Sequence, residues 1–160
     1  MKLIPSLLVG AMLAGLTGAA VAGTSSATFP ATATVVPACA VSAANLQFAN
    51  VGNISSASGF AGSQAQTTIS LACNDATLNA TVELDKQPMV NATDGTTVLA
   101  YNLFQDASLT TPWGTTAQSE AKTLAATYGI QSLTVYGQIP AQPNVVAGAY
   151  AAPVNVTVSY

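Results

Sequence analysis

The sequence contains no histidine and no arginine, and only 6% of its 160 residues are charged, against about 25% in a typical soluble domain. Without histidine there is no imidazole to serve as a base or a metal ligand. Without arginine there is no guanidinium to bind a phosphate or carboxylate in a bidentate manner. The few lysines cannot form a nucleic-acid-binding surface. The composition therefore favours a structural or binding protein.

The acidic residues also offer little chemistry. Asp75, Asp94 and Asp106 stand in turn-like sequences. Each could be one ligand of a calcium site, but no D-x-D-x-D spacing is present, so turn stabilisation is favoured. Glu83 and Asp85 are two residues apart in an expected strand, where a solvated face is favoured over an acid–base pair. We therefore expect no catalytic residue, no metal site and no cofactor.

Residues 1–22 are typical of a secretory signal peptide, with Lys2 before an apolar stretch and Ala20-Val21-Ala22 as an A-x-A cleavage site. A transmembrane anchor is the alternative, but glycine and threonine residues interrupt the apolar run. Removal of the signal leaves two lysines against six acids, a formal charge of 2 − 6 = −4. A negative surface disfavours binding to anionic membranes or nucleic acid. We expect an exported protein that does not insert into a membrane.

Two cysteines, Cys39 and Cys73, remain after cleavage. An even number of cysteines in an exported chain implies one disulfide, here closing a long loop. Loop-closure entropy assigns such a bond a stabilisation of roughly 4 kcal/mol. A redox-active role is disfavoured, because there is no C-x-x-C sequence and no neighbouring cation.

Apolar residues alternate with polar ones with a period of two, which predicts half-buried β-strands. Gly, Asn, Asp and Pro separate these stretches. The single helical candidate is residues 118–127, a short stretch for which a loop is the alternative. Trp113-Gly114 is interpreted as a loop anchor in preference to a sugar-stacking site. The pattern predicts an immunoglobulin-like β-sandwich, with a small barrel as the competing fold. The strongest strand patterns lie in residues 69–73, 78–84, 98–104, 133–139 and 154–160.

Residues 23–38, ahead of the first cysteine, contain an amphipathic stretch that has no evident partner. The amphipathic stretch, residues 27–35, would span roughly 30 Å as a strand, which is enough to follow a sheet edge. Pro30 has no N–H and restricts how such a strand can pair. An ordinary first strand of the same sandwich remains the alternative interpretation. The residues on the apolar face are Ala27, Phe29, Ala31, Ala33 and Val35.

The sequence ends at Tyr160, within a strand pattern and with no following strand to cover its edge. We therefore expect an open groove at one end of the chain and a spare strand at the other. If the strand of one molecule fills the groove of the next, the contact does not close on itself and produces a filament.

Several stretches together resemble the spore coat protein U domain family, over about residues 29–160. The similarity lies in their order and spacing. They are residues 39–48 (CAVSAANLQF), 100–106 (AYNLFQD), 113–114 (WG), 136–140 (YGQIP), 148–150 (GAY) and 154–160 (VNVTVSY).

This resemblance implies an incomplete, pilin-type immunoglobulin-like β-sandwich that is completed by the N-terminal strand of another subunit. It implies a subunit of an archaic chaperone–usher pilus serving surface attachment and biofilm formation, with a periplasmic chaperone, an outer-membrane usher and identical or related subunits as partners. Cys39 and Cys73 would be the family's disulfide. The apolar face of residues 23–38 would be the donor strand. The acceptor edge, which meets the chaperone first, would be Val154, Val156, Val158 and Tyr160.

The expected organisation is a signal peptide (1–22), a donor-strand extension (23–38) and a β-sandwich domain (39–160). Two other functions remain open. One is a secreted coat or matrix protein of the same fold that forms no pilus. The other is a small outer-membrane barrel, which a terminal aromatic strand also suits but which 6% aromatic residues disfavour.

Overall fold

The computed structural model describes residues 23–49, 54–55, 59–60, 62–143 and 145–160. The predicted signal peptide, residues 1–22, lies outside the described residues. Contacts divide the chain after Thr34, and residues 35–160 form one compact unit. Among the described residues, the single helical segment is a 3₁₀ turn at Thr116–Gln118, and no helix is long and apolar enough to cross a membrane.

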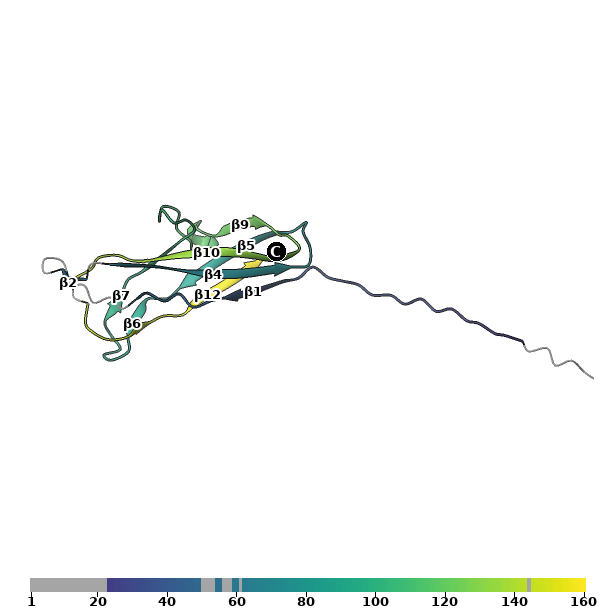
Figure 1. Ribbon diagram of the computed structural model, residues 1–160, viewed down its shortest axis with the longest axis horizontal. Helices are drawn as coiled ribbons and strands as arrows, with labels where there is room; N and C mark the ends of the chain where they lie inside the picture. The colour runs from purple at the N-terminus through teal and green to yellow at the C-terminus, as the bar shows by residue number, and fades with distance from the viewer. Residues whose placement is uncertain (1–22, 50–53, 56–58, 61, 144) are drawn as a thin grey trace, which may run out of the picture. The chain divides into compact units, whose positions relative to one another are not determined.

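Two long antiparallel strands, β4 and β10, form the centre of the compact unit (Figure 1). They pair over their full length, from Gly129 opposite Cys73 to Ile139 opposite Ser63. Side chains alternate between the two faces of a strand, and in β4 this turns Ile69 and Leu71 into the core. The sheet order is β1-β4-β10-β8, with β1 at Cys39–Ala43, β4 at Ser63–Cys73, β8 at Asn102–Phe104 and β10 at Gly129–Ile139.

A second sheet has the order β12-β5-β9 and carries Val82 and Leu84 on its inner face. A smaller sheet has the order β11-β6-β7, and β2 and β3 pair with each other. The bounds are β5 Asn79–Lys86, β9 Lys122–Ala125, β12 Val154–Ser159, β6 Met89–Asn91, β7 Val98–Leu99, β11 Tyr150–Ala151, β2 Ile54–Ser55 and β3 Gly59–Phe60.

The core lies between the inner faces of the two larger sheets. Trp113, Ile69 and Leu71 are among its most deeply buried side chains. β1 and β12 each stand at the outer edge of their sheet, so each pairs with a strand on one side only within the described chain. The all-β sandwich with open sheets confirms the fold predicted from the alternating pattern.

Two details of the sequence prediction differ from the structure. Residues 98–104 form β7 and β8 in different sheets, although Leu99, Tyr101 and Leu103 are all buried as their shared face predicted. Residues 118–127, the helical candidate with a loop as its alternative, contain no α-helix. The 3₁₀ turn ends at Gln118 and β9 follows at Lys122–Ala125. In β9 the burial alternates with a period of two, and the Thr81 and Thr123 hydroxyl oxygens lie 3.2 Å apart across the ladder to β5.

Residues 23–38 form no strand, and every one of them is exposed to solvent. Phe29 is 87% exposed and Val35 is 82% exposed. Large apolar side chains that are exposed to this extent have a free-energy cost of hydration, which burial against another surface would remove.

Candidate functional site

A groove with a volume of about 1240 Å³ opens between the two unpaired edges of the sandwich. One wall is residues 43–49, which begin in β1, and the other is residues 145–154 together with Val156 of β12. Inward-facing side chains of both sheets line its base, among them Ile69, Leu84 and Val135. The groove therefore gives access to the hydrophobic core itself.

The first wall of the groove depends on the absence of a side chain at Gly137 in β10. A Cβ atom there would lie 2.7 Å from Leu46 Cδ2 and 2.8 Å from Phe48 Cζ. With glycine, Leu46 and Phe48 pack against the core, and the Phe48 ring meets Tyr101 edge-on at 6.5 Å between centroids. Gly137 thus positions the first wall of the groove.

The second wall is held by Asn91, a fully buried polar residue at the end of β6. Its side-chain oxygen accepts a hydrogen bond from the Thr93 N–H at 2.8 Å, and its amide nitrogen lies 3.5 Å from the Val146 carbonyl oxygen. Gly148 allows this close approach, since a Cβ there would lie 2.7 Å from the Asn91 amide. The wall is further fixed by the Tyr150 hydroxyl, which donates to the Val146 carbonyl at 2.7 Å.

Tyr101 lines the groove, and its hydroxyl is buried without a hydrogen-bond partner in the described part of the chain. Burial, and secondly the nearby charge of Asp85, raises the pKa of this hydroxyl. Lys86 lies over the Tyr101 ring at 5.1 Å and donates to the Tyr101 carbonyl at 2.7 Å. The ring is thus fixed while its hydroxyl is unsatisfied.

We predict that Tyr101→Phe raises the free energy of unfolding by about 1 kcal/mol, because a buried, unsatisfied hydroxyl costs about 1–3 kcal/mol. Tyr150→Phe is the matched control. It removes a hydroxyl that does have a partner, and should lower stability by about 1 kcal/mol. Urea unfolding of both variants measures the difference. Equal destabilisation by the two substitutions would show that the Tyr101 hydroxyl is satisfied.

The structure brings part of the predicted acceptor edge to the groove. Val154 and Val156 line it, whereas Val158 and Tyr160 are not among its lining residues. Val158 is half-buried against the core, and Tyr160 is 53% exposed. Sequence reasoning missed Leu46, Phe48, Gly137 and Asn91, which shape the two walls.

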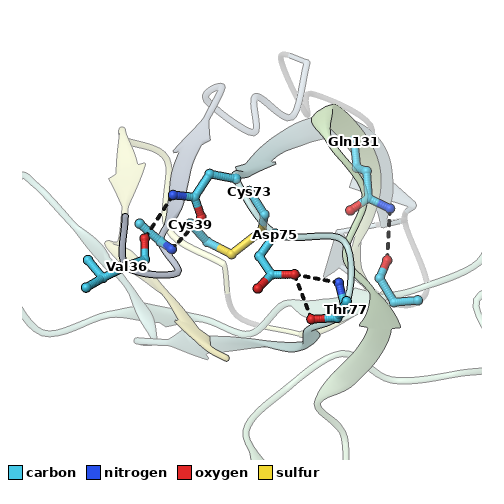
Figure 2. The surroundings of a disulfide bond; sticks show 9 residues. Val36, Cys39, Cys73, Asp75, Thr77 and Gln131 are labelled. Atoms are coloured by element: carbon cyan, nitrogen blue, oxygen red, sulfur yellow. Dashed lines mark hydrogen bonds between the residues drawn. A yellow bond between two sulfur atoms is a disulfide. The ribbon is translucent and has the colours of Figure 1, made fainter. Parts of the chain in front are cut away.

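The disulfide joins Cys39 and Cys73, which lie directly opposite each other in β1 and β4 (Figure 2). It fixes the first residue of β1 to the end of the central sheet where residues 23–38 join the domain. No free cysteine occurs in the described chain.

The three aspartates considered as calcium ligands each close a turn. Asp75 accepts two hydrogen bonds from Thr77 (Figure 2), Asp94 accepts from the N–H groups of residues 96 and 97, and Asp106 accepts from those of residues 110 and 111. The described residues contain no group of three or more His, Cys, Asp or Glu side chains placed to hold a metal ion.

Two of these turns, those of Asp94 and Asp106, make the stability of the fold depend on pH in the acid range. Hydrogen bonds from Thr97 and Thr96 lower the pKa of Asp94 from 3.8 to about 2. At Asp106 burial acts in the opposite direction, but the hydrogen bonds from Thr110 and Thr111 together outweigh it and lower the pKa to about 2. The folded state therefore favours the ionised carboxylates.

A carboxylate with a lowered pKa stabilises the fold above its unfolded pKa, and that contribution disappears as pH falls through the folded pKa. We expect the melting temperature to stay constant from pH 8 to pH 5, because the chain has no histidine to titrate in that range. It should then fall between about pH 4 and pH 2. Thermal melts of Asp94→Asn with Asp106→Asn test this. The double variant should lose less stability across that window, and a fall as large as in the parent would contradict the assignment.

Hydrogen bonds hold Glu83 in its ionised form, not in the protonated form that a general acid needs. Glu83 accepts hydrogen bonds from the hydroxyl and the N–H of Thr116, and these lower its pKa. A general acid requires a raised pKa. The preferred interpretation of Trp113 is also supported, since it is 1% exposed and cannot present its ring to a sugar.

The geometry defines an all-β sandwich with an apolar groove between two unpaired strand edges. A profile of the Spore Coat Protein U domain family matches residues 25–157, and the chain belongs to this family. No curated protein sequence matches the chain closely enough to count as a relative.

One solved structure of similar fold is the CsuC–CsuE chaperone–tip adhesion subunit pre-assembly complex from archaic chaperone–usher Csu pili of Acinetobacter baumannii. The TM-score is 0.54 at 23% sequence identity, and the alignment covers 79% of this chain. It covers 41% of that chain, so this protein spans well under half the length of its structural neighbour. At this identity the likeness shows the fold.

Proposed function

We propose that this protein is a structural subunit of an archaic chaperone–usher pilus that polymerises by donor-strand complementation. The observation that carries the proposal is the groove that opens into the core between residues 43–49, which begin at the end of the edge strand β1, and residues 145–154 with Val156, which include part of the edge strand β12. An apolar groove with free N–H and C=O groups along its edges suits an added strand better than a small ligand.

Residues 23–38 supply a strand with matching properties. Ala27, Phe29, Ala31, Ala33 and Val35 lie on one face when extended, and all are exposed in the single chain. Burial of such side chains in another subunit's groove stabilises the contact by about 25 cal/mol per Å² of apolar area. Phe29 is by far the largest of the five and would contribute most.

The proposed function extends to the export of the subunit, its assembly partners and the role of the filament. Residues 1–22 direct export, and the structural neighbour comes from a chaperone–subunit complex, so a periplasmic chaperone and an outer-membrane usher are proposed partners. The acceptor edge that the chaperone would meet includes Val154 and Val156, which line the groove, and Val158 and Tyr160, which continue the same alternation beyond it. The assembled filament would serve surface attachment and biofilm formation.

The proposal predicts that Phe29→Ala weakens filaments more than any other substitution on the donor face. Replacement of a buried Phe by Ala typically costs about 3–5 kcal/mol, and we expect about 3 kcal/mol per subunit contact, measured as urea-induced filament dissociation. Thr28→Ala is the control, since Thr28 lies on the opposite face and should change little. Filaments of Phe29→Ala that resist urea and heat as the parent does would contradict the role of this strand.

A further inference from the structure

The connection between the extension and the domain is held by Asn74, the residue after the disulfide cysteine of β4. The β1–β4 ladder ends at Cys39 opposite Cys73, and one further backbone bond runs from the Asn74 N–H to the Ala38 carbonyl at 3.0 Å. The Asn74 side chain then continues the ladder. Its oxygen accepts from the Ala38 N–H at 2.7 Å, and its amide donates to the Val36 carbonyl at 3.0 Å.

These bonds continue the hydrogen bonding of the ladder to Val36, three residues before the start of β1 at Cys39 (Figure 2). Pro37 stands between the two bonded residues and has no N–H of its own. A proline also restricts the residue before it to extended conformations, here Val36. Asn74 and Pro37 therefore both oppose a chain reversal at residues 36–38.

The place of the reversal decides whether the extension can reach its own groove. If the chain turned at residues 36 and 37 and paired back along β1, Phe29 would stand level with Ala44, and Ala27 with Leu46. Both Ala44 and Leu46 line the groove. A two-residue turn at residues 34 and 35 would pair Ala33 with Val36, whose carbonyl is already bonded to Asn74. With residues 36–38 held, the nearest two-residue turn that leaves these bonds intact therefore lies at residues 33 and 34.

Such an upstream turn shifts the pairing by six residues. Phe29 would then stand level with Ala38, and Ala27 with Ala40, whereas the groove begins at Ala43. Ala33 would lie in the turn itself. None of the five apolar side chains of the extension would enter the groove of its own chain.

We propose that Asn74 and Pro37 form a clamp that prevents the extension from entering the groove of its own chain. The extension is then available to bind in the groove of a second copy. This inference rests on the proposed function and adds how a chain that carries both strand and groove avoids completing itself. Asn74 and Pro37 are positioning residues, because neither contacts the groove.

The test compares full-length proteins refolded from denaturant at low concentration and analysed by size-exclusion chromatography. The clamp variant, Asn74→Ala with Pro37→Gly, should yield a folded monomer and on the order of tenfold less polymer, since two net hydrogen bonds no longer oppose the reversal. Asp75→Ala is the matched control and should polymerise as the parent does, because within the described residues the Asp75 carboxylate bonds to Thr77 alone. A clamp variant that polymerises like the parent would overturn the inference.

A second pair of proteins separates self-completion from misfolding. Phe29→Glu with Ala31→Glu makes the extension unable to enter an apolar groove, and this non-donor variant should remain monomeric and bind a peptide of residues 27–35. Adding the clamp substitutions should leave its peptide binding unchanged, whereas the clamp variant with its own intact extension should not take up peptide. If the clamp substitutions abolish binding in both backgrounds, the effect is structural and the inference fails. If the non-donor variant binds no peptide at all, the proposed function fails with it.

Discussion

Deletion of residues 23–35 should abolish polymerisation while leaving a folded domain that retains its groove. The deletion removes every apolar side chain of the proposed donor face and preserves the Val36 carbonyl that Asn74 holds. Because the groove walls and base lie within residues 43–156, the acceptor function should survive. Electron microscopy and sedimentation of the exported protein measure the loss.

Deletion of residues 23–26 alone provides the matched control. This Gly-Thr-Ser-Ser stretch precedes the first apolar residue of the donor face, so filaments should form at the parent's yield. Filaments formed by the longer deletion would exclude donation by this segment, and loss of filaments from the shorter one would place the essential residues elsewhere.

The second large effect is expected at Trp113. Trp113 is among the largest fully buried side chains, and its indole Nε1 donates to the Val82 carbonyl at 3.0 Å. Trp113→Ala should cost about 4 kcal/mol, since it leaves a cavity and also removes the hydrogen bond to the Val82 carbonyl. Urea unfolding measures this loss, which is a large share of the roughly 5–15 kcal/mol by which an ordinary domain is stable.

Trp113→Phe separates the two contributions. The phenyl ring fills most of the cavity but cannot donate to Val82, so we expect a smaller loss of about 1–2 kcal/mol. The Lys122 ammonium lies 5.5 Å from the centroid of the Trp113 ring, and in this variant it would still face an aromatic ring. A loss below about 1 kcal/mol for Trp113→Ala would contradict the role of this side chain as a central core residue.

The main strands were predictable because one face of each is buried. In β4, Ile69, Leu71 and Cys73 are buried and the residues between them are not, which is the period-two signal that the sequence carries. Residues 118–127 were ambiguous between a helix and a loop for a related reason. Their alanines suit a helix, but Lys122 and Leu124 are the half-buried residues of β9, so the tertiary pairing with β5 outweighed local propensity.

The groove was only partly predictable. Val154 and Val156 follow a regular alternation, whereas the opposite wall is the irregular segment containing Leu46 and Phe48. That wall is placed by the missing side chain of Gly137, some 90 residues further along the chain, a contact with no local signal. The Asn74 side-chain ladder is likewise invisible to periodicity, because an isolated asparagine after a strand equally indicates a turn.

The most direct test of donor-strand complementation is a titration of the non-donor variant, Phe29→Glu with Ala31→Glu, with a synthetic peptide of residues 27–35. Calorimetry and thermal melts would be recorded with this peptide and with a scrambled peptide of the same composition. The account predicts saturable one-to-one binding of the native sequence and a melting temperature that rises with peptide concentration, as binding to the folded state alone requires. No binding, or an equal rise with the scrambled peptide, would contradict it.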